Sequence, residues 1–317
     1  MPLDQDPIHA DEALLQLGRL LRADGYRFTC VTPATQARVN GRPEACRARN
    51  LRDVFGWSRP FAPSLINADA LTAMAAAGVL STQDDLLRST VRWSSLGDLL
   101  LAHSAWPTDS HDAVFFGPDS YRFVRAIHGH LQHCPHPLRH AVDIGCGAGV
   151  GALSIARAAP HAHITAVDIN PLALRYTAVN AALAGVANVS LFASDLLGSV
   201  SGNFDLIVAN PPYMLDASER VYRHGGGRLG AQLSLRIVEQ ACERLLPGGT
   251  LLLYTGVAVV DGRDALLEAV RLRLAGPAFS WAYEELDPDV FGEQLLEPGY
   301  EQVERIAAVA LTVTRNG

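Results

Sequence analysis

From residue 140 onward the sequence alternates between short apolar runs and amphipathic segments of helical length. This alternation predicts parallel strands joined by crossover helices that cover both faces of one sheet. We expect strands over 140–144, 163–168, 189–193, 204–209 and 250–255, and helices over 150–159, 171–184, 230–246 and 262–274. Two more strands, 280–285 and 305–314, have no helix between them and should pair antiparallel. The predicted fold class is therefore α/β, with a doubly wound, mostly parallel, seven-stranded sheet.

The first 110 residues do not share this alternation. Leu14, Leu17 and Leu21 recur at helical spacing between a capping Asp11 and the terminating Gly25. Further helices are expected over 51–57 and 67–77, followed by short strands over 90–94 and 98–103. We therefore predict a smaller, mainly helical substrate-recognition domain over 1–110 and a second domain over 111–317. Helices followed by a hairpin are also the order of a winged-helix module, and that alternative stays open.

Composition narrows the class of protein. The net charge of −7 disfavours tight nucleic-acid binding, which usually requires a basic excess. The five cysteines form no C-x-x-C pair, as is typical of reduced thiols in a cytoplasmic protein. The acidic N-terminus carries no apolar signal core, and no apolar run reaches the roughly 18 residues of a membrane span. We expect a cytoplasmic protein that does not associate with membranes.

A glycine-rich turn follows the first strand of the alternating region. It reads Asp143-Ile144-Gly145-Cys146-Gly147-Ala148-Gly149 and runs directly into the first helix. Glycine permits a tight turn and lets a ligand approach the backbone, while the helix N-terminus offers free N–H groups. Such a turn is shared by sites for nicotinamide, flavin and S-adenosylmethionine.

Acidic residues follow the next two strands. Asp168, before Ile169, ends the second strand, where a carboxylate can accept both ribose hydroxyls of an adenosine. Asp195 follows the third strand and is suited to the amino group of adenine, with Leu196 packing on the ring. Asp195 at this position is equally well explained as a helix cap.

The fourth strand ends in Asn210-Pro211-Pro212-Tyr213. Asn210 offers a side-chain carbonyl, and the two prolines fix the backbone and remove two N–H donors. Tyr213 offers a flat ring face. Together these residues are suited to hold a planar –NH2 group by its hydrogens while its nitrogen attacks an electrophile.

At these four strand ends the chain resembles the class I S-adenosylmethionine (SAM)-dependent methyltransferases, which have a Rossmann-like fold. Within them it is similar to the HemK-like branch, the release-factor glutamine methyltransferases and their relatives, over about residues 112–317. Residues 116–120 lie where that family has a segment that covers the cofactor pocket. The resemblance implies SAM as the cofactor and Asn210, Pro211, Pro212 and Tyr213 as the catalytic residues. The implied cofactor contacts are Phe116, Asp143, Gly145, Cys146, Gly147, Gly149, Asp168, Ile169, Asp195, Leu196 and Asn210.

We therefore expect a SAM-dependent N-methyltransferase whose preferred acceptor is a glutamine side chain of a protein. The alternatives are an amino group of a base in ribosomal or transfer RNA, a small molecule, and a nicotinamide-dependent oxidoreductase. The histidines of residues 128–140 match no standard zinc spacing, so no metal is expected. The glycine-rich segment from Arg223 to Arg228 is either a substrate-covering loop or a flexible solvent loop.

Overall fold

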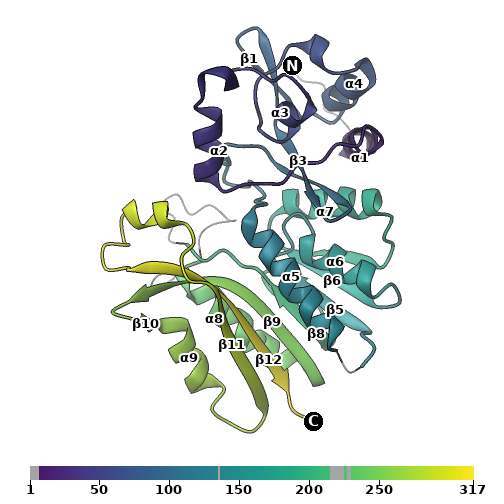
Figure 1. Ribbon diagram of the computed structural model, residues 1–317. Helices are drawn as coiled ribbons and strands as arrows, with labels where there is room; N and C mark the ends of the chain where they lie inside the picture. The colour runs from purple at the N-terminus through teal and green to yellow at the C-terminus, as the bar shows by residue number, and fades with distance from the viewer. Residues whose placement is uncertain (1–6, 135, 215–224, 227–229) are drawn as a thin grey trace.

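The computed structural model of the protein describes residues 7–134, 136–214, 225–226 and 230–317 (Figure 1). One large mixed sheet forms the lower part of the molecule in Figure 1, and the N-terminal elements lie above it. Arg223 and Arg228, which bound the predicted loop, lie outside the described residues.

The large sheet has the strand order β11-β12-β9-β8-β5-β6-β7, and the short strand β10 (Arg263–Asp264) pairs with β9. Its parallel strands are β5 (His140–Ile144), β6 (His163–Asp168), β7 (Val189–Ala193), β8 (Phe204–Ala209) and β9 (Leu245–Val260). At the far edge, β12 (Arg305–Arg315) pairs antiparallel with both β9 and β11 (Phe279–Asp287). The predicted doubly wound, mostly parallel sheet with an antiparallel end is confirmed, with β10 as an additional short strand.

Helices cover both faces of this sheet, as its apolar strands require. Ala141 and Leu206 face the first apolar cluster, which includes residues of α5 (Pro118–Gln132), α6 (Val150–Ala158) and α7 (Pro171–Ala184). The alternate strand residues Val142 and Ile207 face a second cluster with α8 (Gln232–Arg244) and α9 (Ala265–Arg273). The period of two along each strand therefore fills both layers of the core.

The N-terminal elements comprise four α-helices, two short 3₁₀ turns and two hairpins within the described residues. These elements are α1 (Pro7–Ala23), α2 (Pro33–Asn40), η1 (Pro43–Ala45), α3 (Leu51–Phe55), η2 (Pro63–Leu65), α4 (Ala68–Ala76), β1 (Leu80–Gln83) with β2 (Leu86–Ser89), and β3 (Val91–Leu96) with β4 (Leu99–Ser104). Helix α2 and the first hairpin have no counterpart among the predicted elements. The proposed boundary near residue 110 remains a prediction.

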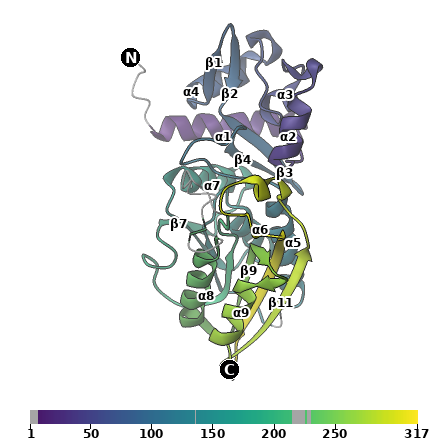
Figure 2. The ribbon, with the colours of Figure 1, turned by 90° about the vertical axis from the view of Figure 1, so that its left-hand side faces the viewer.

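The N-terminal elements pack on α7, and Figures 1 and 2 both show α1 next to it. At Gly18 of α1 a Cβ atom would lie 2.6 Å from the ring of Trp93 and 2.8 Å from Leu183 of α7, so only glycine allows this approach. Asp11 forms an ion pair with Arg175 of α7. Residues from both parts of the chain share one continuous apolar cluster. The N-terminal elements are therefore held firmly against the helix that follows β6.

Candidate functional site

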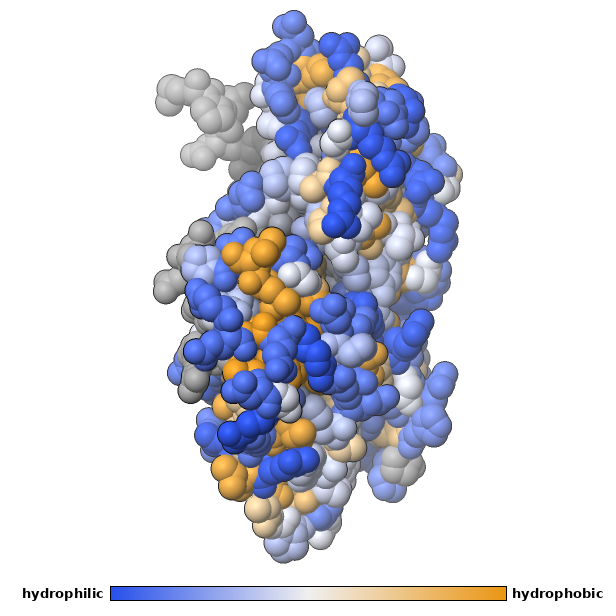
Figure 3. All heavy atoms as spheres, turned by 60° about the vertical axis from the view of Figure 1, so that its left-hand side comes forward, coloured by the Kyte–Doolittle hydropathy of each residue, from blue (hydrophilic) through white to orange (hydrophobic). Residues whose placement is uncertain are grey.

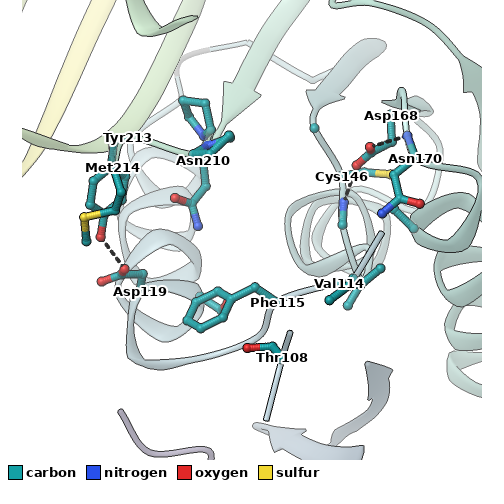
Figure 4. Close-up of a pocket in the computed structure, with 18 of the residues that line it drawn as sticks. Thr108, Val114, Phe115, Asp119, Cys146, Asp168, Asn170, Asn210, Tyr213 and Met214 are labelled. Atoms are coloured by element: carbon teal, nitrogen blue, oxygen red, sulfur yellow. Dashed lines mark hydrogen bonds between the residues drawn. The ribbon is translucent and has the colours of Figure 1, made fainter. Parts of the chain in front are cut away.

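A cavity of about 600 Å³ opens at the carboxyl ends of the parallel strands, where such sheets bind ligands (Figure 4). The face of the molecule shown in Figure 3 carries hydrophobic side chains gathered below the more hydrophilic N-terminal elements. Twelve of the predicted site residues line this cavity: Asp143, Gly145, Cys146, Gly147, Asp168, Ile169, Asp195, Leu196, Asn210, Pro211, Pro212 and Tyr213. The predicted cofactor and acceptor residues therefore meet in one space.

The glycine-rich turn presents bare backbone to this cavity. Gly145 and Gly147 have φ angles of 69° and 55°, in the left-handed region that favours glycine. A Cβ atom at Gly145 would meet nothing within 4 Å, so the space in front of the turn is open. Gly149, with φ 80°, does not line the cavity and instead precedes α6, where a Cβ would lie 2.9 Å from Thr177. The turn thus fits a ligand that lies directly on the backbone.

Asp168 is fixed beside this turn by two backbone N–H groups. Its Oδ2 accepts from Gly147 and its Oδ1 from Asn170, both at 2.9 Å. Burial raises the pKa of this carboxyl, and the backbone donors oppose that rise. A carboxylate has about four acceptor positions, so two remain for a pair of ribose hydroxyls. The geometry therefore fits the adenosine part of SAM.

Asp143 also lines the cavity, but its contacts are internal. Its Oδ2 accepts the Ala152 N–H at 2.8 Å, and the side chain is almost completely buried. Burial raises the pKa of Asp143 to about 7. A Cβ at Gly151 would lie 2.7 Å from Oδ2, so the carboxyl is packed against the start of α6. The contacts indicate that Asp143 anchors the helix behind the glycine turn.

The two predicted adenine contacts differ in exposure. The Asp195 side chain is 65% exposed and pairs with Arg236 of α8 at 2.8 Å. Leu196 is buried and has a φ of 51°, while Ile169 is 58% exposed beside Asp168. The Asp195 carboxylate would have to share its charge between Arg236 and an adenine amino group.

Phe116 does not line the cavity, although it was predicted as a cofactor contact. Its ring stacks on His103 with centroids 5.1 Å apart, in the core below the site. The neighbouring Phe115 lines the cavity instead, together with Val114 (Figure 4). Successive side chains in an extended segment point to opposite sides, so in the segment before α5 a shift by one residue places Phe115, and not Phe116, in the cavity.

The end of β8 brings the predicted catalytic residues to the opposite wall from Asp168. Figure 4 shows Asn210 between the glycine turn and the side chains of Tyr213 and Asp119. The Tyr213 hydroxyl donates to Oδ2 of Asp119 at 2.6 Å. Asp119 belongs to the segment 116–120 that the sequence marks as a pocket cover, but its bond to Tyr213 was not predicted. A contact across 94 residues leaves no local signal in the sequence.

Three further segments contribute to the cavity wall, and the sequence did not mark any of them. Pro33, Ala34 and Ala37 of α2 lie on one side, next to the segment from Trp106 to Asp109. Phe291 and Glu293, at the start of the 3₁₀ turn η4 (Gly292–Leu296), lie on another. Regions outside the strand ends thus contribute to the wall of the cavity.

No group of three metal-ligating side chains occurs within the part of the chain that the structure describes. The histidines of residues 128–140 fall at the end of α5 and the start of β5. No helix among the described residues is long and apolar enough to cross a membrane.

Residues 127–258 match the family model of the methyltransferase small domain. The chain is 37% identical over 163 residues to a release factor glutamine methyltransferase from Deinococcus radiodurans, covering 48% of this chain and 55% of that protein. It is 32% identical over 151 residues to ribosomal RNA small subunit methyltransferase C from Erwinia tasmaniensis, covering 44% and 43%. The chain spans about half the length of the curated relatives that it matches.

Among solved structures, Trm5b from Pyrococcus abyssi superposes with a TM-score of 0.51 and 15% identity, covering 75% of this chain and 62% of that one. At this identity the likeness concerns the fold alone, and it agrees with the observed sheet. The glycine turn, Asp168 and Asn210 all lie within the residues that match the family model. The match removes the reason to expect a nicotinamide cofactor. Taken with the geometry of the cavity, it shows that residues 127–258 are similar to the methyltransferase small domain, and it supports S-adenosyl-L-methionine as the cofactor.

Proposed function

We propose that this protein transfers a methyl group from SAM to the nitrogen of a planar amide or amino group. The observation that carries the proposal is that Asn210-Pro211-Pro212-Tyr213 lines the same cavity as the glycine turn and Asp168. The cofactor-holding residues and the residues suited to a planar –NH2 group therefore face each other across one space.

The chain's own residues would position the acceptor. When bound, SAM supplies a methyl group on a positively charged sulfur. The nitrogen lone pair of an amide is delocalised, and hydrogen bonds from its N–H groups to Asn210 and to the Pro211 carbonyl would return electron density to nitrogen. The nitrogen must lie in line with the methyl group, and holding it there can account for much of the rate. No strong general base is needed, because the proton can leave after the transfer.

The preferred acceptor is a glutamine side chain of a protein. Two curated relatives, from Deinococcus radiodurans and Koribacter versatilis, are named release factor glutamine methyltransferases, at 37% and 34% identity. The charge of the cavity supports this preference. Its wall carries Asp109 and Glu293 but no arginine among the described residues, and the sequence contains no lysine. Such a wall disfavours the phosphate groups that flank a nucleic-acid base.

An amino group of an RNA base is the second candidate. It is favoured by the similarity to ribosomal RNA small subunit methyltransferase C, since a base amino group is as planar as an amide. The N-terminal elements would select the acceptor in either case, because α2 contributes part of the cavity wall.

The test is transfer of radiolabelled methyl from SAM into protein, RNA and metabolite pools, using the wild-type protein and the Asn210→Ala variant. We expect label in the protein pool. The transfer rate of the variant should be at least about 10²-fold lower, because the acceptor nitrogen would no longer be held in line with the methyl group. Affinity for S-adenosylhomocysteine should stay within a few-fold. Label in RNA alone would favour the second candidate. Equal rates for both proteins would show that Asn210 does not position the acceptor.

A further inference from the structure

Asp119 lies at the centre of a buried hydrogen-bond network next to the catalytic motif. It is the second residue of α5, and its side chain is 4% exposed. Its carboxylate accepts from the hydroxyl of Tyr213 at 2.6 Å and from the hydroxyl of Tyr254 at 2.8 Å. Arg122, one turn along α5, donates to it at 3.2 Å. One carboxylate thus joins α5 to the motif and to the centre of β9.

The network also reaches the other wall of the cavity. Arg122 donates to Asp287 at 2.7 Å, at the end of β11. The chain continues from there to Phe291, whose ring lies edge-on to Tyr213 with centroids 6.3 Å apart. The motif and the wall that faces the acceptor are therefore tied to the same group of charges.

Tyr213 has little freedom in this arrangement. A Cβ at Gly256 would lie 2.1 Å from the Tyr213 ring, so the ring rests directly on the backbone of β9. The hydroxyl is held by Asp119 at the other end of the ring. Between Tyr213 and Asn210 stand only two prolines, whose rings restrict the backbone. A displacement of the Tyr213 hydroxyl would therefore pass to Asn210 rather than being absorbed between them.

We propose that Asp119 is a positioning residue for methyl transfer, which sets the orientation of Asn210 by holding the Tyr213 hydroxyl. The inference rests on the proposed function, in which Asn210 holds the acceptor nitrogen. It assigns to the Tyr213 hydroxyl a role that the sequence does not reveal, because a ring face alone would be supplied equally by phenylalanine.

Tyr254 provides a matched control. Its hydroxyl binds the same carboxylate, and its side chain is completely buried, but it comes from β9 and does not line the cavity. Tyr213→Phe and Tyr254→Phe each remove one hydroxyl and one bond to Asp119 while keeping the ring. If the network serves stability alone, the two variants should behave alike.

The experiment compares these two variants with the wild type in three measurements: the urea midpoint of unfolding, the dissociation constant for S-adenosylhomocysteine, and the single-turnover transfer rate at saturating acceptor. We expect both variants to lose similar stability and to keep the dissociation constant within about threefold. Tyr213→Phe should slow transfer by roughly tenfold or more, and Tyr254→Phe by less than about threefold. Adding Asp119→Asn to Tyr213→Phe should slow transfer little further, because both changes act on the same hydrogen bond between Tyr213 and Asp119. Equal slowing by the two phenylalanine variants would overturn the proposal.

A second measurement is independent of any acceptor. The side-chain amide signals of Asn210 in ¹⁵N-labelled protein with S-adenosylhomocysteine should move in Tyr213→Phe and stay in place in Tyr254→Phe. Unmoved signals in both variants would overturn the positioning role. If the wild type transfers no methyl group to any pool, the proposed function fails, while these signals still decide whether Asp119 orients Asn210.

Discussion

The side-chain amide of Asn180 pairs with both backbone groups of Ala102. Its Nδ2 donates to the Ala102 carbonyl at 3.0 Å, and its Oδ1 accepts the Ala102 N–H at 2.7 Å. The same Nδ2 donates to the Ala148 carbonyl of the glycine turn at 2.9 Å. One completely buried side chain on α7 thus connects β4 of the N-terminal elements with the turn that fits the cofactor.

Replacing Asn180 by alanine should therefore destabilise the whole chain. It leaves three buried backbone groups, on Ala102 and Ala148, without this partner. We expect a loss of about 2–4 kcal/mol in the free energy of unfolding, measured by urea denaturation. Asn188→Ala is the control, because its Nδ2 also contacts three carbonyls but only within the large sheet and its helices. Proteolysis within the N-terminal elements should become faster in Asn180→Ala alone. Unchanged stability would show that Asn180 is not a structural connection.

Removing the carboxylate of Asp168 should weaken cofactor binding without unfolding the protein. Asp168→Ala deletes the acceptor for two ribose hydroxyls, so the dissociation constant for S-adenosylhomocysteine should rise at least about tenfold by calorimetry. Asp195→Ala should have a smaller effect, since the Asp195 carboxylate is exposed and shared with Arg236. A larger effect at Asp195 than at Asp168 would contradict this assignment of the two acids.

Asp143 should give the stability of the ligand-free protein a distinctive pH dependence. Burial raises the pKa of Asp143 to about 7 in the folded chain, from an ordinary value of 3.8. Between these values the folded state binds more protons than the unfolded state, so the contribution of this group to stability falls as pH rises from about 4 to about 7. Asp143→Asn keeps an acceptor for the Ala152 N–H but carries no charge.

The stability of Asp143→Asn relative to wild type should therefore increase between pH 4.5 and pH 8, by roughly 4 kcal/mol at most. Urea denaturation at the two pH values measures this difference. A difference that does not change with pH would mean that another group is responsible for the titration.

A bulky side chain on α2 should block the acceptor but not the cofactor. Ala34 lines the cavity, so the phenylalanine ring of Ala34→Phe would fill part of the space for the acceptor. The KM for the acceptor should rise about tenfold or more. Affinity for S-adenosylhomocysteine should stay within about threefold. Arg38→Phe is the control on the same helix, since Arg38 is exposed and does not line the cavity. Equal effects of the two variants would argue against α2 as part of the acceptor wall.

The sequence predicts best those elements whose own local pattern of apolar and polar residues determines where they begin and end. The strands 140–144, 163–168, 189–193 and 204–209 begin and end at the predicted residues, because each is an apolar run bounded by polar residues or glycine. Helix α2 was missed because its sequence, PATQARVN, carries no apolar stripe. It is specified instead by Thr32, whose side chain accepts the Thr35 N–H, and by Pro33 in the first turn.

Contacts between distant residues could not be predicted in the same way. The sequence places Tyr213 at the site, but the partner of its hydroxyl comes from α5, and the wall at Phe291 comes from the loop between β11 and β12. The sequence around Pro247-Gly248-Gly249 suggests a turn, and although β9 spans it, β8 pairs with Leu245 and then only from Thr250, so the pairing is irregular there.

The position of β12 in the sheet has a consequence for the biosynthesis of the protein. This strand lies between β9 and β11 and is the last of the three to be synthesised. A nascent chain that has reached only β9 contains the glycine turn, Asp168 and Asn210, but neither Phe291 nor the strand that separates β9 from β11. The residues that hold the cofactor are thus made well before the cavity has its full wall. Methyl transfer to a selected acceptor should accordingly begin only after translation has passed β12, so that unfinished chains on the ribosome stay inactive.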